Sequence, residues 1–193
     1  MNLTERFNRA MLLASKLHRH QWRKGTDIPY LSHLLAVSAL VMEHGGTEDE
    51  AIAALLHDAV EDQGGVPTLE RIRNDFGETV ADLVMALSDT AESPKPPWRD
   101  RKEEYLDHLE VAPHPVLLIS AADKLHNART ILEDYREIGD ALWGRFSVPA
   151  DEQRWYYRSL SEVFQRRLGG PLSSELDRTV GALEALIDAR LHQ

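Results

Sequence analysis

The chain has 193 residues, of which 42% are hydrophobic, and it carries a formal net charge of −10 at neutral pH. This length and composition suit one globular domain with a sizeable core and argue against a disordered chain. The acidic balance disfavours sequence-independent binding to duplex nucleic acid, although a local basic patch can still bind a small anion. Because cysteine is absent, disulfides, thiol catalysis and sulfur-based zinc sites are excluded.

The apolar pattern of the sequence predicts neither a membrane span nor a secretory signal. No apolar run reaches the roughly 18 residues of a membrane span. The N-terminus, MNLTERFNRAML, lacks the unbroken apolar stretch of a secretory signal. We therefore expect a cytoplasmic protein that binds neither membrane nor nucleic acid. The sequence does not indicate an oligomeric state.

Apolar spacing predicts helices along almost the whole chain. Thr4 is placed to cap the first helix, and the loop RKGTDIPY (23–30) separates it from an apolar helix over 32–46. Thr47 and Glu50 have capping-box spacing and open the third helix. With no β alternation and no internal repeat, the fold class we predict is all-α.

The third helix is expected to continue through ALLHDAVED (54–62) and to end at Gly64 and Gly65. Segments 91–100 and 139–151 are expected to be connectors. Thr68 is expected to cap a short helix that runs to Phe76. The remaining predicted helices, in chain order, span 78–89, 101–110, 116–135, 152–168 and 174–191.

Ionisable side chains gather at the end of an apolar run in ALLHDAVED. Their burial is costly unless something pairs with them, and a bound cation meets that need. In a continuous helix His57 lies above Glu61 and Asp58 lies above Asp62, so the two pairs point into one sector. His57 and Asp58 can then offer an imidazole nitrogen and a carboxylate oxygen to one divalent metal ion.

Two further ligands are sought among histidines and acids placed in apolar helices. His33 follows a turn at the start of SHLLAV, and Asp123 lies within LLISAADKLHNA. A site of His33, His57, Asp58 and Asp123 has mixed nitrogen and oxygen ligands, which suit manganese, iron or zinc better than calcium. The plainer alternative is a packed or solvated residue, and we expect it for the remaining histidines: His18, His20, His44, His108, His114, His126 and His192.

The order of these four residues resembles the HD phosphohydrolase superfamily. HDAVED is similar to the HDxxED form of RelA/SpoT-type hydrolase domains, and the segments RKG, PYLSH, FGETVADLV and ADKLHNART resemble further stretches of that family. The resemblance covers roughly residues 4–168. It implies a single HD-fold helical bundle over residues 1–193, with 174–191 as its C-terminal helix.

The resemblance also implies an activity. RelA/SpoT-type hydrolases release pyrophosphate from the 3′ position of ppGpp and pppGpp, so the products expected here are GDP or GTP plus pyrophosphate. One divalent ion, manganese, is the expected cofactor. Glu61 and Asp62 correspond to the family's catalytic pair, with Glu61 placed to orient or deprotonate water. The length leaves no room for synthetase or regulatory domains, which suggests a stand-alone small alarmone hydrolase similar to metazoan SpoT homologues.

The nucleotide-binding residues are implied by the same resemblance. Arg23 is expected to pack against guanine beside Lys24. Basic residues of 95–102 either receive the distal phosphates or form a solvated face, and Tyr156 either closes the base pocket or belongs to the core. The substrate-binding residues we expect are Arg23, Lys24, Asn127, Thr130, Lys95, Arg101, Lys102 and Tyr156.

Two alternative functions stay open. The same metal centre can serve a phosphatase acting on another nucleotide, such as a 5′-nucleotidase or an NADPH phosphatase. A catalytically inactive module that only binds a nucleotide is the other. The complete set of ligands together with Glu61 and Asp62 argues against the inactive module.

Overall fold

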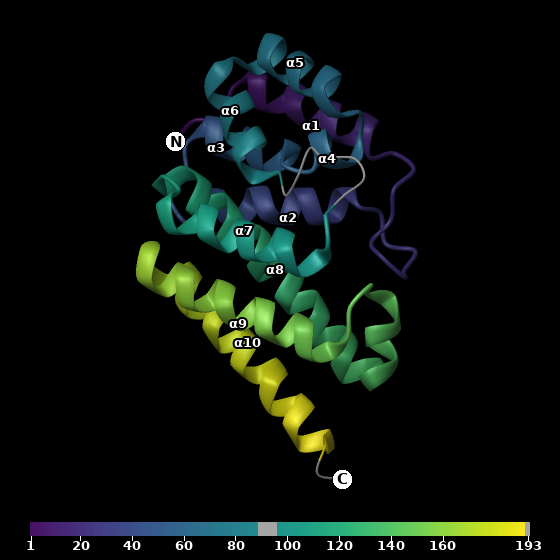
Figure 1. The fold of residues 1–193 in the computed structure, drawn as a ribbon. Coiled ribbons are helices and arrows are strands. Elements are labelled where there is room, and N and C mark those ends of the chain that lie inside the picture. The colour runs from purple at the N-terminus through teal and green to yellow at the C-terminus, as the bar shows by residue number, and fades with distance from the viewer. Residues whose placement is uncertain (89–95, 192–193) are drawn as a thin grey trace. The chain divides into compact units, whose positions relative to one another are not determined.

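The structure is a computed structural model that describes residues 1–88 and 96–191, and its helices are labelled in Figure 1. Within these ranges there is no strand; the β structure is one isolated bridge between Trp22 and Pro29. The all-α prediction is therefore confirmed. None of the described helices is long and apolar enough to cross a membrane.

Contacts divide the chain into two compact units, which we describe separately. The first comprises residues 1–96 and 113–122, and the second comprises 97–112 and 123–193. The first unit holds α1 (Glu5–Leu17), α2 (Leu31–Glu43), α3 (Glu48–Leu56), α4 (Ala59–Asp62), α5 (Gly65–Phe76) and α6 (Glu78–Leu87). The second holds α7 (Trp98–Val111), the 3-10 helix η1 (Gly139–Arg145), α9 (Ala150–Arg167) and α10 (Gly170–Leu191), and α8 (His114–Ile138) begins in the first unit and continues in the second.

Helix α3 is the centre of the first unit. It packs against α1, α2 and α6, and every side chain from Ala51 to Leu56 is fully buried. A helix that is apolar on all sides is stable only when neighbours surround it. The hydroxyl of Ser38 in α2 donates to the carbonyl of Ala51 at 2.9 Å and ties α2 to α3. The C-terminal end of α3 is thereby fixed against α2.

Local capping signals were predicted correctly. The Thr4 hydroxyl accepts a hydrogen bond from the amide of Arg6 at 3.2 Å and begins α1. The capping box at α3 is complete, because the Thr47 hydroxyl accepts from the Glu50 amide at 3.3 Å and the Glu50 carboxylate accepts from the Thr47 amide at 2.5 Å. Both signals act within one turn and therefore depend little on tertiary structure.

The prediction of a continuous helix through residues 54–62 is wrong. Helix α3 ends at Leu56, His57 and Asp58 form a turn, and α4 then begins at Ala59. Nδ1 of His57 lies 2.7 Å from the carbonyl oxygen of Ala54, the acceptor that the amide of Asp58 meets in an unbroken helix. The side chain thus competes with the backbone for this carbonyl.

Other boundaries also differ from the expectation. Thr68 is not an N-cap: α5 begins at Gly65, and the Thr68 hydroxyl donates to the Gln63 carbonyl at 2.7 Å from inside the helix. Pro67 fits because the first helical turn needs no amide donor there. Segment 139–151 is not a plain connector, since it contains η1 and the start of α9. Trp98 already begins α7, and the expected loop at 91–95 lies outside the described residues.

In the second unit the last two helices, α9 and α10, pack against each other as an antiparallel pair (Figure 1). Arg158 of α9 donates to Glu184 and, at 2.7 Å, to Asp177 of α10. The hydrogen bond to Glu184 and the nearby carboxylates raise the pKa of Arg158 above its ordinary value. Both helices also carry fully buried apolar side chains, among them Phe164 of α9 and Leu176 of α10.

Candidate metal centre

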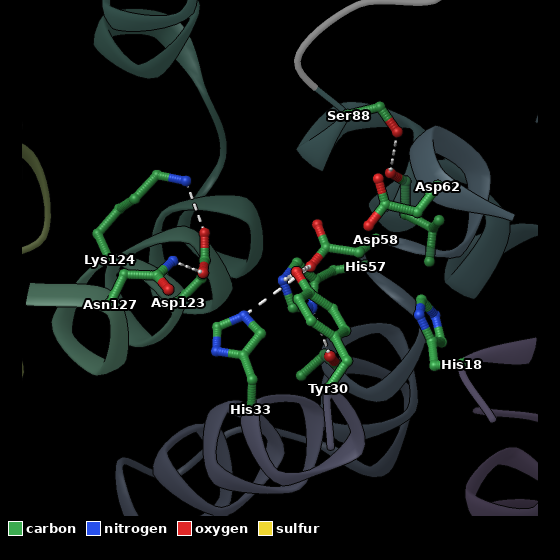
Figure 2. Close-up of polar contacts among 12 residues, drawn as sticks. His18, Tyr30, His33, His57, Asp58, Asp62, Ser88, Asp123, Lys124 and Asn127 are labelled. Atoms are coloured by element: carbon green, nitrogen blue, oxygen red, sulfur yellow. Dashed lines mark hydrogen bonds and ion pairs between the residues drawn. The ribbon is translucent and has the colours of Figure 1, made fainter. Parts of the chain in front are cut away.

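Three of the predicted metal ligands lie together in the first unit. His33 is in the first turn of α2, and His57 and Asp58 form the turn between α3 and α4. Nε2 of His57 lies 3.0 Å from Oδ2 of Asp58, and Nε2 of His33 lies 3.8 Å from the same oxygen. One donor atom from each residue falls within 4.8 Å of the other two, and Figure 2 shows the three side chains converging.

The imidazole of His57 is oriented for metal binding. Its Nδ1 lies 2.7 Å from the Ala54 carbonyl oxygen, which can only accept, so Nδ1 carries the proton. Nε2 therefore presents its lone pair toward Asp58. Metal-ligating histidines usually have this arrangement, in which the other ring nitrogen donates to a backbone carbonyl.

Tyr30 holds the carboxylate of this group. Its hydroxyl donates to Oδ2 of Asp58 at 2.5 Å, and its ring lies 5.4 Å from that of His33 between centroids. Sequence reasoning missed this residue, although Tyr30 directly precedes α2 in PYLSH. A hydrogen bond between residues 28 positions apart gives no local signal.

The predicted catalytic pair follows on α4. Glu61 is half-buried and Asp62 is exposed. The Asp62 carboxylate nevertheless accepts a hydrogen bond from the side-chain amide of Gln21 at 2.8 Å. Burial of the carboxyl group raises the pKa of Asp62, the Gln21 hydrogen bond opposes this, and the charges of Asp58 and Glu61 raise it further. The structure thus places the pair beside the His33–His57–Asp58 group, while its catalytic role stays a prediction.

Asp123, the fourth predicted ligand, belongs to the second unit. It is buried in α8, where Oδ1 accepts from Nδ2 of Asn127 and Oδ2 accepts from Nζ of Lys124, both at 2.6 Å (Figure 2). Burial by itself lowers the pKa of Lys124, but Asp123, Tyr105 and Tyr156 together outweigh it, and the pKa is raised well above its ordinary value. Sequence reasoning missed Lys124. Ligation of metal by Asp123 stays a prediction.

The substrate residues predicted near the first helix lie on the 21–30 loop. The guanidinium of half-buried Arg23 is 5.7 Å from the centroid of the Tyr30 ring, and Lys24 is exposed. Arg23 therefore lies against the side chain that holds Asp58. Contact of Arg23 and Lys24 with a nucleotide stays a prediction.

The remaining predicted substrate residues belong to the second unit or lie outside the description. Tyr156 is buried, 5.2 Å from Nζ of Lys102 and next to Trp98. Arg101 is half-buried on α7, and the hydroxyl of Thr130 donates to the His126 carbonyl at 3.0 Å. Lys95 lies outside the described residues. Substrate contact by these residues and by Asn127 stays a prediction.

The residues present fit a divalent cation. Two imidazoles and a carboxylate are ligands that first-row divalent metals prefer, and they sit where burial of His33 and His57 is nearly complete. The side chain of Asp58 keeps 22% of its area exposed, which leaves an approach for solvent or substrate. Such a partly open centre is the pattern of catalytic rather than structural metal sites.

An all-helical unit with a His–His–Asp group at a helix break defines the class of HD-type metal-binding proteins. The chain belongs to the HD domain family, whose sequence model matches residues 10–142. This confirms the family that the spacing of His33, His57 and Asp58 resembles. A single domain over residues 1–193 stays a prediction.

Curated relatives carry names from alarmone metabolism. The chain is 36% identical to guanosine-3′,5′-bis(diphosphate) 3′-pyrophosphohydrolase MESH1 of Xenopus tropicalis over 121 residues, 61% of this chain and 65% of that protein. It is 33% identical to the bifunctional (p)ppGpp synthase/hydrolase SpoT of Escherichia coli K12 over 133 residues, 66% of this chain and 18% of that protein. The chain thus spans less than two thirds of the length of these relatives.

Solved structures share the fold. A metazoan ortholog of SpoT, described as hydrolysing ppGpp and acting in starvation responses, aligns with a TM-score of 0.75 at 24% identity and covers 93% of this chain and 96% of that one. The crystal structure of lmo0812 from Listeria monocytogenes EGD-e aligns with a TM-score of 0.65 at 27% identity, over 81% and 99% of the two chains. The predicted HD fold is confirmed.

Proposed function

We propose that this chain is a metal-dependent phosphohydrolase that removes pyrophosphate from the 3′ position of guanosine alarmones, giving GDP from ppGpp and GTP from pppGpp. The observation that carries the proposal is the convergence of His33, His57 and Asp58 at the break between α3 and α4, with Glu61 and Asp62 directly after it. The names of the MESH1 and SpoT relatives support a guanosine nucleotide as substrate. We propose the cytoplasm as its location.

The proposed cofactor is one manganese ion held by His33, His57, Asp58 and Asp123. When bound, such an ion lowers the pKa of a water molecule and polarises a phosphoryl oxygen. The nitrogen and oxygen ligands that manganese prefers are present in the first unit, where a hydrogen bond to the Ala54 carbonyl fixes the orientation of the His57 ring. Asp123 is included on the family resemblance of ADKLHNART.

In the reaction, water oxygen bonds to the phosphorus attached to the ribose 3′ oxygen, and the bond from that phosphorus to the 3′ oxygen breaks. Glu61 accepts the proton of the attacking water, and Asp62 relays a proton or holds Glu61, so that the departing 3′ oxygen is protonated. Half-burial of Glu61 on α4 fits this role because it limits competing hydrogen bonds to bulk water.

Nucleotide recognition is assigned to the predicted basic and polar residues. Arg23 stacks on guanine, which its position over Tyr30 supports, and Lys24 contacts phosphate. Lys102 and Arg101 on α7 take the distal phosphates. The complete set proposed is Arg23, Lys24, Asn127, Thr130, Lys95, Arg101, Lys102 and Tyr156.

Incubation of the purified protein with manganese and ppGpp, followed by identification of products, tests the proposal. Stoichiometric GDP and pyrophosphate are expected. Release of inorganic phosphate from ppGpp, or turnover of NADPH or a nucleoside 5′-monophosphate instead, would establish the alternative nucleotide phosphatase. Metal binding with no turnover of any of these compounds would leave an inactive binding module.

A further inference from the structure

A polar network outside the proposed ligands and catalytic pair reaches the Asp62 carboxylate. Gln21, in the loop after α1, donates from Nε2 to Oδ2 of Asp62 at 2.8 Å. Its Oε1 accepts from Nε2 of Gln63 at 2.7 Å and lies 2.6 Å from Nδ1 of His18. One amide therefore makes three hydrogen bonds, and one of them ends on a proposed catalytic acid.

The directions of these bonds follow from the chemistry of the groups. An ionised Asp62 carboxylate can only accept, so the NH₂ group of Gln21 faces it. The oxygen of Gln21 then faces both His18 and Gln63, and Nδ1 of His18 must carry the proton. The amide is fixed against a flip, because a flip would turn its oxygen toward the acceptor-only Asp62 carboxylate and its NH₂ group toward the NH₂ group of Gln63.

The backbone of Gln21 is anchored as well. Its amide donates to the His18 carbonyl at 3.1 Å, and its carbonyl accepts from the amide of Tyr30 at 2.9 Å. The backbone of Gln21 is thus bonded to His18 at one end of the loop and to Tyr30 at the other. Gln21 is therefore held by its own backbone and by the side chains of His18 and Gln63, in addition to its bond to Asp62.

His18 links this network to the metal group. Its ring is 98% buried and stacks on Tyr30 with centroids 5.4 Å apart and planes inclined by 23°. The hydroxyl of Tyr30 donates to Asp58. Nε2 of His18 is buried with no hydrogen-bond partner among the described residues, so the hydrogen bonding of the ring runs through Nδ1 to Gln21.

We propose that Gln21 is a positioning residue for Asp62: with its amide locked by His18 and Gln63, it fixes Oδ2 of the carboxylate and leaves Oδ1 to act in the reaction. The inference rests on the proposed function. The specific consequence is that loss of the amide lowers turnover without weakening metal binding, because the three side-chain hydrogen bonds of Gln21 run to Asp62, Gln63 and His18, which are not proposed metal ligands.

The test compares Gln21→Ala and the isosteric Gln21→Glu with wild type, and uses His20→Ala as the matched control because His20 is exposed in the same loop. For both Gln21 variants we expect kcat to fall about 10–100-fold, KM for ppGpp to stay within about twofold and manganese affinity to be unchanged. Equal kcat in Gln21→Ala and wild type overturns the inference, as does a loss of manganese affinity that explains the whole decrease.

His18 provides a rescue experiment. Asparagine keeps an N–H donor at the position of Nδ1, whereas leucine removes it at similar volume. We expect His18→Asn to retain kcat within about threefold and His18→Leu to lose about tenfold or more. Equal loss in the two variants assigns His18 to packing and overturns its part in the network.

A measurement without substrate separates this inference from the proposed function. The side-chain NH₂ resonances of Gln21 in a ¹⁵N–¹H spectrum are expected to shift in Asp62→Ala and to be unchanged in His20→Ala. Unchanged resonances in Asp62→Ala overturn the inference. If wild type shows no pyrophosphate release, the proposed function fails, and this spectrum alone decides whether Gln21 holds Asp62.

Discussion

Glu61 is the residue whose substitution separates chemistry from metal binding. It contributes a carboxylate next to the His33–His57–Asp58 group, but it is not among the three side chains whose donor atoms converge and could hold a cation. We expect Glu61→Gln to keep manganese affinity within about threefold and to lose roughly 10²–10⁴-fold in kcat, the usual contribution of a general base. Calorimetric titration with manganese and a pyrophosphate-release assay measure the two quantities. A fully active Glu61→Gln enzyme would show that another group activates the water.

Asp62 is expected to reduce stability at neutral pH in the metal-free protein. Burial and the charges of Asp58 and Glu61 raise its pKa in the folded state, against the opposing bond from Gln21. Because the folded protein binds the Asp62 proton more tightly than the unfolded chain does, the stabilisation linked to this proton is fully present at pH values below the unfolded pKa of about 3.9. It is lost as the pH rises through the pKa of the folded state. Asp62→Asn removes this loss.

The corresponding measurement is urea unfolding in chelator at several pH values. Asp62→Asn is expected to unfold at higher urea than wild type near pH 7, with the difference shrinking as the pH is lowered toward about 4. Equal midpoints throughout that range would mean that the Asp62 carboxyl group is fully solvated. The proposed catalytic residue Asp62 would then carry no cost in stability.

At the scale of elements, the turn between α2 and α3 joins the helix that carries His33 to the helix that leads into His57. Gly46 is buried in this turn, and a Cβ there would lie 2.5 Å from Cγ1 and 2.9 Å from the carbonyl oxygen of Val41. The contact with backbone cannot relax by a rotamer change. We expect Gly46→Ala to lower the free energy of unfolding by about 1–3 kcal/mol and to weaken manganese binding.

Gly144→Ala is the matched control for that substitution. A Cβ at Gly144 meets nothing within 4 Å, and the residue has no left-handed backbone requirement. Its effect on stability should stay within about 0.5 kcal/mol. Similar destabilisation by both substitutions, measured by urea unfolding, would show that crowding at Val41 is not the cause.

The sequence predicts those elements whose signals are local. Thr4, Thr47 and Glu50 cap their helices as expected, because each bond closes within one turn. The break at His57 was not predictable, since it depends on a ring nitrogen reaching the Ala54 carbonyl. Threonine is a common N-cap residue, but α5 begins before Thr68, at Gly65, with Gly64 as its N-cap. Both glycines have left-handed backbone angles.

The candidate site was predictable in its ligand types and not in its supporting contacts. Histidines and acids in apolar helices point to a metal because their burial needs compensation. Tyr30, Gln21 and Gln63 are ordinary polar residues of loops and helix ends, and their bonds join positions 28 to 42 residues apart. Spacing carries no information about such contacts.

At the scale of the whole molecule, metal binding should be coupled to stability. A ligand that binds only the folded state adds about 2.7 kcal/mol at a free concentration one hundred times its Kd, or roughly 5–10 °C in Tm for a chain of this size. We expect this increase with manganese and its reversal by chelator. His57→Ala and Asp58→Asn should abolish it, because each removes a donor atom of the convergent group.

The net charge of −10 makes a control for diffuse ion binding necessary, since an acidic surface attracts divalent cations without a defined site. Diffuse attraction is screened by about 0.15 M salt, whereas ligation by buried imidazole is not. At that salt concentration His20→Ala should keep the full manganese-induced increase in Tm, and Asp123→Asn should lose most of it if Asp123 is the fourth ligand. An increase of equal size in His57→Ala and wild type would mean that manganese stabilises the protein from its acidic surface, and the metal centre proposed at His33, His57 and Asp58 would be wrong.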